Sequence, residues 1–306
     1  HYERNFTMDD IVFSRQLPGI FAQEALRLGD YPMANRHFHE YLELYFMLEG
    51  ERYYFVEQDT YRIVPRTAIL VNSSQIHKTS KVNSHAEHHR FLLHLEPSVI
   101  DSQFSMKDFP SVKDIGNNYW GIAEFSPEDW QMVLQLIEMM KTEMKRYSIE
   151  AGHMSVLFVM QLIALFVQNR KDQEISGVSS PASVYSIRTG IHQKVHEIAL
   201  YLQNHCGEPC TLEEISQQFQ ISIPYLTRIF KSVTSFSVME YRNICRIRKA
   251  KTLLCDTDLS VTEIASRCGF GNITYFEKIF KRMTEYSPLQ FRKSEDSFPD
   301  SDRAGI

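Results

Sequence analysis

Residues 211–242 read TLEEISQQFQISIPYLTRIFKSVTSFSVMEYR, and residues 260–292 read SVTEIASRCGFGNITYFEKIFKRMTEYSPLQFR. The second stretch repeats the first, at an offset of 49 residues before the turn and 50 residues after it. Each copy opens with Ser or Thr and has Glu three positions later, the capping box with which many helices begin. A short turn then leads to a second helix, with Ser222 or Asn272 as its N-cap. The repeat predicts two helix-turn-helix units.

The second helix of each unit has an apolar side and a polar side. A recognition helix of this kind presents its outward side chains to base edges in the major groove of DNA. The candidate DNA contacts in the first unit are Pro224, Thr227, Arg228 and Lys231. The candidates in the second unit are Ile273, Thr274, Glu277, Lys278 and Lys281.

One continuous helix is expected between the two units, over residues 238–255. It would hold the units at a fixed separation, and its Arg246 is a candidate contact to DNA phosphates. The charge distribution points to the same partner. The whole chain has a net charge of −5, yet residues 225–293 hold 13 Lys and Arg against 6 Asp and Glu, or +7. A basic module in an otherwise acidic chain is where a polyanion would bind.

Segment 190–293 resembles the DNA-binding domain of the AraC/XylS family of transcription regulators. The resemblance lies in RIRKAKTLL at 246–254, DLSVTEIA at 258–265 and SPLQFR at 287–292, together with the aromatic positions between them. It implies seven helices, with two recognition helices in successive major grooves of double-stranded DNA. It also implies a homodimer that works with RNA polymerase.

The N-terminal part has a different pattern. Between residue 31 and about residue 100, short stretches of alternating apolar and polar residues are separated by turns, which is typical of a sandwich or barrel. We therefore expect an α+β protein of two domains. The expected order is a cupin-like effector-binding barrel, dimerisation helices, a linker, the DNA-binding domain and an acidic disordered tail, at 1–125, 126–170, 171–189, 190–293 and 294–306.

One motif within the predicted barrel could carry chemistry. His37, His39, Glu43 and Gly50 fit the H-x-H-x3-E-x6-G core of the first cupin motif, and His77 stands where a later histidine is expected. On a strand, alternate residues share a face, so this set converges inside the barrel. The motif allows three interpretations. They are an effector pocket without metal, ordinary barrel packing, and a divalent metal site made by His37, His39, Glu43 and His77. The candidate effector residues are Arg36, His37, His39, Tyr41, Glu43, Tyr45, His77 and Arg90.

Other classes of protein fit the sequence less well. The longest apolar run, residues 154–167, is 14 residues long and is too short to span a bilayer. The five cysteines have no paired zinc-ligand spacing, and the first residues have no apolar signal segment. These features indicate a cytoplasmic protein that does not bind membranes.

The sequence thus predicts a transcription regulator, an activator and not an enzyme, that is controlled by a small molecule in the barrel. A carbohydrate is the favoured effector, because the predicted interior face mixes aromatic and polar side chains. The alternative is a metal-dependent cupin enzyme fused to a DNA-binding domain. A third possibility is a regulator without an effector, whose barrel serves only for dimerisation.

Overall fold

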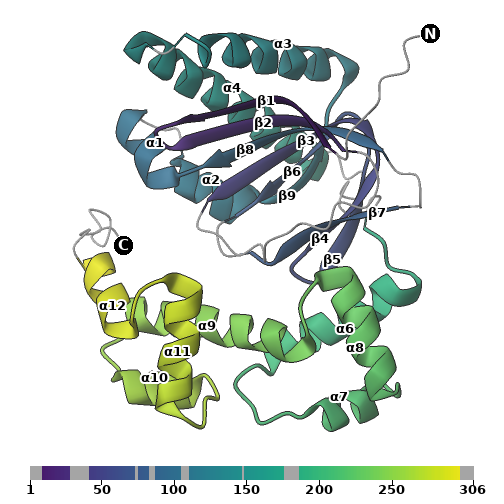
Figure 1. Cartoon of the computed structure of the whole chain (residues 1–306), viewed down its shortest axis with the longest axis vertical. Coiled ribbons are helices and arrows are strands. Elements are labelled where there is room, and N and C mark those ends of the chain that lie inside the picture. Colours follow the sequence, from purple (N-terminus) through teal and green to yellow (C-terminus); the bar gives the residue numbers. More distant parts are fainter. Residues whose placement is uncertain are drawn as a thin grey trace. The chain divides into compact units, whose positions relative to one another are not determined.

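The computed structural model describes residues 9–27, 41–72, 75–82, 87–104, 110–146, 148–175 and 186–296. The chain forms two compact units, His1–Arg188 and Thr189–Ile306. The first is built on β-sheets and the second is helical (Figure 1). The predicted α+β architecture of two domains is therefore confirmed.

The N-terminal unit contains two antiparallel sheets. A six-stranded sheet has the order β1-β2-β8-β3-β6-β9, and a three-stranded sheet has the order β5-β4-β7. The strands are β1 (Asp9–Leu17), β2 (Ile20–Arg27), β3 (Leu42–Gly50), β4 (Arg52–Val56), β5 (Asp59–Ile63), β6 (Thr67–Val71), β7 (His77–Lys81), β8 (His88–Leu95) and β9 (Gly121–Glu124). Strands β3 to β6 and β8 follow the alternating stretches of the sequence, whereas β1, β2, β7 and β9 were not predicted. The start of the first alternating stretch, residues 37–40, lies outside the described residues.

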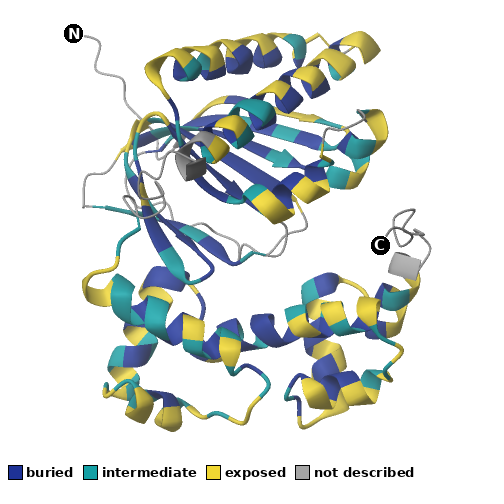
Figure 2. Cartoon of the chain, turned by 180° about the vertical axis from the view of Figure 1, so that it is seen from behind, coloured by how far each residue is buried: buried dark blue, intermediate teal, exposed yellow. Residues whose placement is uncertain are grey.

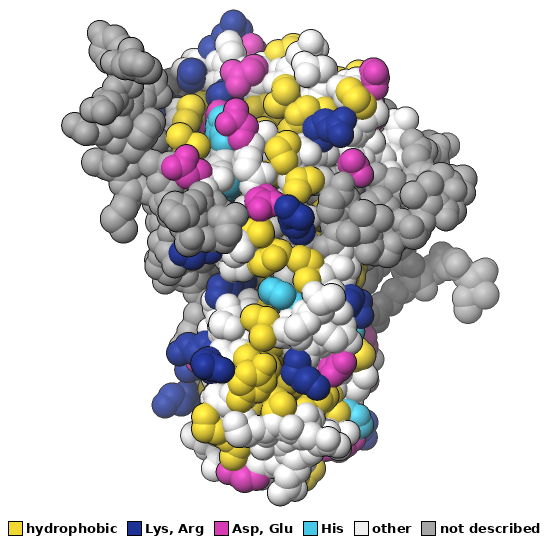
Figure 3. All heavy atoms as spheres, turned by 90° about the vertical axis from the view of Figure 1, so that its right-hand side faces the viewer, with side chains coloured by type: hydrophobic (Ala, Val, Ile, Leu, Met, Phe, Trp, Pro, Cys, Tyr) yellow, Lys and Arg dark blue, Asp and Glu magenta, His cyan; other side chains and the backbone are white. Residues whose placement is uncertain are grey.

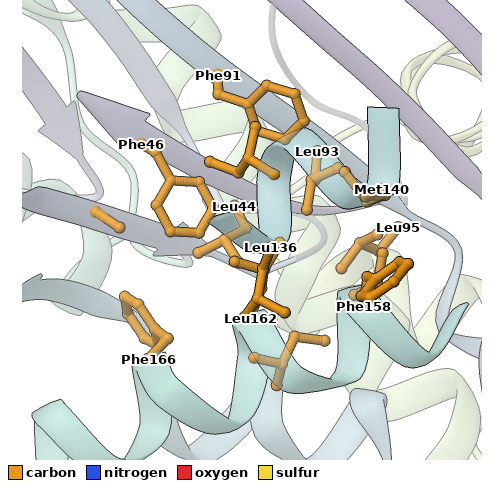
Figure 4. Close-up of a cluster of buried hydrophobic side chains, with 14 of the residues drawn as sticks. Leu44, Phe46, Phe91, Leu93, Leu95, Leu136, Met140, Phe158, Leu162 and Phe166 are labelled. Atoms are coloured by element: carbon orange, nitrogen blue, oxygen red, sulfur yellow. The ribbon is translucent and has the colours of Figure 1, made fainter. Parts of the chain in front are cut away.

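Each face of the six-stranded sheet packs on a different partner. Strand periodicity sends Leu44 and Phe46 of β3 to one face and Tyr45 to the other. The first face packs on helices, and its core includes Leu136 and Phe166 (Figure 4). The second face meets the three-stranded sheet across a smaller apolar cluster. The helices of this unit are α1 (Pro97–Gln103), α2 (Val112–Tyr119), α3 (Pro127–Glu143) and α4 (Ile149–Ile175).

Helix α3 begins where the sequence predicted a helix start. The Ser126 side chain accepts a hydrogen bond from the Asp129 backbone N–H, and Pro127 occupies the first turn. The inward sides of α3 and α4 are buried and their outward sides are exposed (Figure 2). Helices α1 and α2 had no counterpart in the sequence analysis.

Helix α4 corrects an expectation drawn from length. The apolar run alone seemed too short to span a membrane, but within the helix a 23-residue segment, Ile149–Lys171, is long and apolar enough to do so. Half of its most apolar window is buried inside the protein. Val159, Ile163 and Phe166 contribute to the core against the sheet, as in the core helix of a globular domain.

The predicted linker is partly structured. Helix α4 extends to Ile175, so the first residues expected in the linker are helical. At the other end, Ser186 forms a β-bridge with Tyr61, and Arg188 makes a 2.6 Å ion pair with Asp59. Residues 176–185 lie outside the described part of the chain.

The C-terminal unit contains the helices α6 (Gly190–Asn204), α7 (Leu212–Gln218), α8 (Ile223–Thr234), α9 (Val238–Asp256), α10 (Val261–Arg267), α11 (Ile273–Thr284) and α12 (Pro288–Asp296). Both predicted capping boxes are present, at Thr211 and Ser260. The two copies also share backbone geometry, since Ser235 and Glu285 both end their helices with positive φ, at 68° and 67°. Helix α12 runs to Asp296, so the first residues of the predicted tail are helical, and residues 297–306 are not described.

Candidate DNA interface and effector site

Helix α8 presents most of its predicted DNA-contact side chains to solvent. Pro224, Arg228 and Lys231 are exposed, and the Arg228 guanidinium lies 5.4 Å from the centre of the Tyr225 ring. Thr227 is half-buried, and its hydroxyl donates to the carbonyl oxygen of Ile223 at 2.9 Å. Because the hydroxyl proton is used within the helix, only the methyl group and the acceptor lone pairs of Thr227 are available to an outside partner.

Helix α11 presents its whole predicted set. Ile273, Thr274, Glu277, Lys278 and Lys281 are all exposed. A further side chain on this helix was missed: the exposed Tyr275, whose hydroxyl accepts a 3.1 Å hydrogen bond from Asn243 Nδ2. Its position in the first turn of α11, three residues after the N-cap Asn272, could have indicated it, because the first turn of a recognition helix is the part nearest the bases.

Arg246 is not on this surface, and its prediction as a phosphate contact is corrected. Its side chain is buried, and Nε donates a 2.6 Å hydrogen bond to the carbonyl oxygen of Cys206. The neighbouring Arg242 is also buried and donates to the carbonyl oxygens of Glu208 and Cys210. These two arginines anchor the loop that follows α6. On the face drawn in Figure 3, Lys and Arg side chains are spread over the C-terminal unit.

In the N-terminal unit, Glu43 links the two sheets. Its carboxylate is buried and accepts hydrogen bonds from the Tyr54 hydroxyl of β4 and from His94 Nε2 of β8, the latter at 2.9 Å. His77 Nε2 of β7 lies 3.6 Å from the same carboxylate. Burial alone would lower the pKa of His77, but the negative charge of Glu43 outweighs it and raises that pKa.

Two residues of this network, Tyr54 and His94, were missed by the sequence analysis. His94 pairs directly with Glu43 across β8 and β3, a register that only the folded sheet reveals. Burial, and then the charge of Glu43, raise the pKa of the Tyr54 hydroxyl well above its usual value. The hydroxyl therefore stays protonated and donates to Glu43.

A surface pocket of about 310 Å³ opens beside this network. It is lined by Gln16, Gly19, Phe21, Tyr41, His94 and Glu96. Tyr41 stacks on the His94 ring with the ring centres 5.9 Å apart, and Phe21 approaches the same ring at 5.5 Å. The pocket combines aromatic faces with an imidazole that is hydrogen-bonded to a buried carboxylate.

Tyr45 and Arg90 lie further along the same face of the sheet. The Arg90 guanidinium lies 5.8 Å from the centre of the Tyr45 ring, and its Nη2 donates to Gln23 Oε1 at 2.7 Å. Burial raises the pKa of Tyr45 to about 12 and lowers that of Arg90. Glu43, Tyr45 and Arg90 are thus brought to the side that faces the three-stranded sheet. His77 approaches Glu43 from β7 of that sheet, and Tyr41 lines the pocket.

Three candidate effector residues, Arg36, His37 and His39, lie outside the described residues. Within the described part, no group of three His, Cys, Asp or Glu side chains is arranged to hold a metal ion. Glu43, the carboxylate of the predicted metal set, has one oxygen engaged by Tyr54 and the other by His94.

Two family models match the chain in tandem. The AraC-like ligand binding domain matches residues 21–163, and the helix-turn-helix domain matches residues 215–294. The chain belongs to the AraC family of DNA-binding transcription regulators. The ligand-binding match begins within β2, covers strands β3 to β9 and reaches into α4. The helix-turn-helix match begins within α7, covers α8 to α11 and ends within α12.

Individual AraC-family proteins are similar over different lengths. The HTH-type transcriptional activator RhaR of Mannheimia succiniciproducens is 24% identical over 84% of this chain and 86% of its own length. The activator RhaS of Salmonella arizonae is 37% identical over 35% of this chain and 38% of its own length. Further RhaS proteins are matched over 55 to 60% of their length. Among solved structures, the DNA-binding domain of AdpA in complex with a target DNA is 27% identical, over 33% of this chain and 91% of that one, with a TM-score of 0.32.

Proposed function

We propose that this chain is an effector-responsive transcription activator that reads double-stranded DNA with helices α8 and α11. The observation that carries the proposal is the duplicated, capped helix-turn-helix unit, each copy with an exposed second helix that bears basic side chains. A single unit of this kind is a weak sign of DNA binding. Two copies related by a nearly constant offset support a protein that recognises two adjacent sites on DNA.

The spacing between the two units supports successive major grooves. Helix α9, which joins them, has 19 residues and is therefore about 28 Å long. One turn of B-DNA is about 34 Å, so a helix of this length suits two recognition helices one turn apart.

Each recognition helix offers a different set of contacts. On α8, Arg228 is the candidate for bidentate recognition of guanine, and Pro224 offers apolar contact to a thymine methyl group. On α11, Ile273 offers similar apolar contact, and Glu277 is suited to accept from a cytosine amino group. Lys231, Lys278 and Lys281 are suited to phosphates.

The N-terminal domain is the proposed effector site, and a carbohydrate is the proposed effector. Tyr41 and Phe21 offer aromatic faces on which a sugar ring can stack, while His94 and Glu96 offer hydrogen bonds. A ligand on His94 would also act on Glu43, which holds β3 and β8 to β4 through Tyr54. Binding could in this way bias the packing of the two sheets, as effector control requires.

The proposed dimer contact is the outer side of α3 and α4. Met132 and Met139 on α3, and Met154 and Leu157 on α4, are exposed apolar side chains at helical spacing. Such a surface favours pairing with a second copy. RNA polymerase is the further partner that activation requires. The proposed location is the cytoplasm, where the dimer, the DNA and RNA polymerase would meet.

The experiment is a binding titration of the whole chain on DNA from promoter regions, with and without a panel of mono- and disaccharides. We expect specific DNA binding whose affinity changes with one carbohydrate. An effector present at 100 times its dissociation constant should also stabilise the protein by about 2.7 kcal/mol. DNA binding that no carbohydrate alters would contradict the proposed effector. DNA binding without sequence preference would contradict the proposed sequence-specific recognition by α8 and α11.

A further inference from the structure

Three arginines lie on the inner side of the N-terminal domain. Arg27 of β2 and Arg52 of β4 are only 7% and 2% exposed. Arg90 of β8 stands opposite Met47 of β3 in the strand register, and Met47 belongs to the apolar cluster between the two sheets. All three act on one neighbour, His88 of β8. Burial, and then the charges of Arg52, Arg90 and Arg27, lower the pKa of His88 to about 3. Three guanidinium groups therefore lie close enough to act on this end of β8.

The acceptor that Arg90 and Arg27 share is neutral. Gln23 Oε1 accepts from Arg90 Nη2 at 2.7 Å and is 3.5 Å from Arg27 Nη2. Glu43 attracts Arg90, but its two carboxylate oxygens already accept hydrogen bonds from Tyr54 and His94. Gln23 is neutral, so it does not compensate the charge of Arg90.

Among the described residues, several buried polar atoms of this region have no hydrogen-bond partner, and two of these atoms belong to Arg90 and Tyr45. They are Nη1 of Arg90 and the hydroxyl of Tyr45. The two groups are neighbours, since the guanidinium lies 5.8 Å from the centre of the Tyr45 ring. Buried polar groups are nearly always paired, and an unpaired pair of donors calls for an acceptor. A carboxylate matches them, because it has two acceptor oxygens, carries the compensating charge and suits the guanidinium geometry.

We propose that the effector carries a carboxylate, which accepts hydrogen bonds from Arg90 and Tyr45, so that the ligand is an acidic sugar and not a neutral one. This inference rests on the proposed function, in which the N-terminal domain holds a carbohydrate. It narrows that carbohydrate to the hexuronate or aldonate class. The hydroxyl groups of such a ligand would meet the aromatic and carboxylate side chains on the same face of the sheet.

The test compares matched pairs of ligands on the whole chain at constant ionic strength. Glucose is measured against glucuronate and gluconate, and galactose against galacturonate, by isothermal titration calorimetry. We expect at least one acid to bind about tenfold or more tightly than its neutral partner. Glucose 6-phosphate serves as a second anion, and a preference for it over every carboxylate would overturn the assignment of a carboxylate.

Variants locate the contact. Arg90→Met should weaken binding of the acid about 30-fold or more, and Tyr45→Phe, which keeps the ring, about 3- to 10-fold. Arg62→Met is the matched control, because Arg62 is an exposed arginine on the neighbouring strand β5, paired with Glu51. It should leave binding unchanged. If Arg90→Met does not fold, Arg90→Lys and Tyr45→Phe carry the test.

Each result distinguishes the inference from the function on which it rests. Binding of a neutral sugar as tight as that of its acid, or acid binding that is indifferent to Arg90 and Tyr45, overturns the inference and leaves a carbohydrate effector in place. No binding of any carbohydrate, by a chain that still binds DNA, overturns both the inference and the carbohydrate effector.

Discussion

Arg246 Nε donates a 2.6 Å hydrogen bond to the carbonyl oxygen of Cys206. The same guanidinium lies 5.3 Å from the centre of the Phe270 ring, in the turn of the second helix-turn-helix unit. Gly269 completes the contact, because a Cβ there would lie 2.3 Å from the carbonyl oxygen of Gly207. One buried arginine thus ties the loop before the first unit to the turn of the second, which fixes how the two units are held.

Replacement of Arg246 should therefore affect stability and not the electrostatics of DNA binding. Arg246→Met leaves a buried carbonyl group without its donor, and we expect a loss of about 2–4 kcal/mol in the free energy of unfolding of the C-terminal unit. Urea denaturation measures this loss. The dependence of DNA affinity on salt should keep its slope. Lys249→Met, an exposed neighbour on α9, is the control, with a stability change within about 0.5 kcal/mol. Normal stability of Arg246→Met with a flatter salt slope would return Arg246 to the phosphate contacts.

Arg228→Ala should change which DNA sequence is preferred. Arg228 is exposed on α8, and loss of a bidentate contact to guanine costs about 1–3 kcal/mol at the specific site. The affinity of the variant is measured for DNA sites mutated one base pair at a time. Mutation of the one base pair that Arg228 contacts should no longer lower the affinity of Arg228→Ala, whereas mutations at the other positions should still lower it. Lys281→Ala should weaken binding to all sites alike. Equal losses at every position for Arg228→Ala would show that Arg228 contacts only phosphate.

The N-terminal unit should lose stability in acid because of His88. Its pKa is about 3 in the folded protein and about 6.5 in the unfolded chain, so the unfolded state binds the proton first. Stability then falls as pH drops from about 6.5 towards 3, by up to about 1.4 kcal/mol per pH unit. His77 has the opposite sign: its raised pKa gives stability below pH 6.5 that is lost as pH rises through the folded value. Denaturation of His88→Gln across this range should show a flatter acid limb, while the exposed His153→Gln should match the unchanged protein. An acid limb unaltered by His88→Gln would mean that His88 is not kept neutral.

Removal of metal should not alter the response to the effector. Both carboxylate oxygens of Glu43 already accept hydrogen bonds, one from Tyr54 and the other from His94. A metal ion would have to displace one of these donors. We expect the same thermal stability and the same effector shift with and without EDTA. A large loss of stability in EDTA, restored by one divalent metal, would favour the metal-dependent cupin reading.

The helical half of the fold could be predicted because its signals are local. The capping boxes at Thr211 and Ser260, the N-caps at Ser222 and Asn272 and the helix between the units are all present. Each is specified by residues within one or two turns of one another. The same local signals placed the outward faces of α8 and α11.

The parts that were missed depend on contacts distant in sequence. Strand β2 pairs with β8, about 70 residues later in the chain. The local sequence of residues 20–27 does not indicate that partner. Lys141 lies on a helix whose pattern suggests a solvated charge, yet it is buried and paired with Glu24 of β2. Arg246 was misplaced for the same reason, since its burial depends on Phe270 and on the loop after α6. His94 joined the site only through the register of β3 and β8.

The proposed function requires that α8 and α11 contact DNA in major grooves one helical turn apart. The most direct measurement is selection of bound sequences from random double-stranded DNA by the whole chain. Each selected half-site should contain two short motifs with centres about 10–10.5 base pairs apart, on one side of the duplex. Arg228→Ala should blur one motif of the pair and leave the other intact. Enrichment of a single isolated motif, or of none, would contradict DNA recognition by two helices.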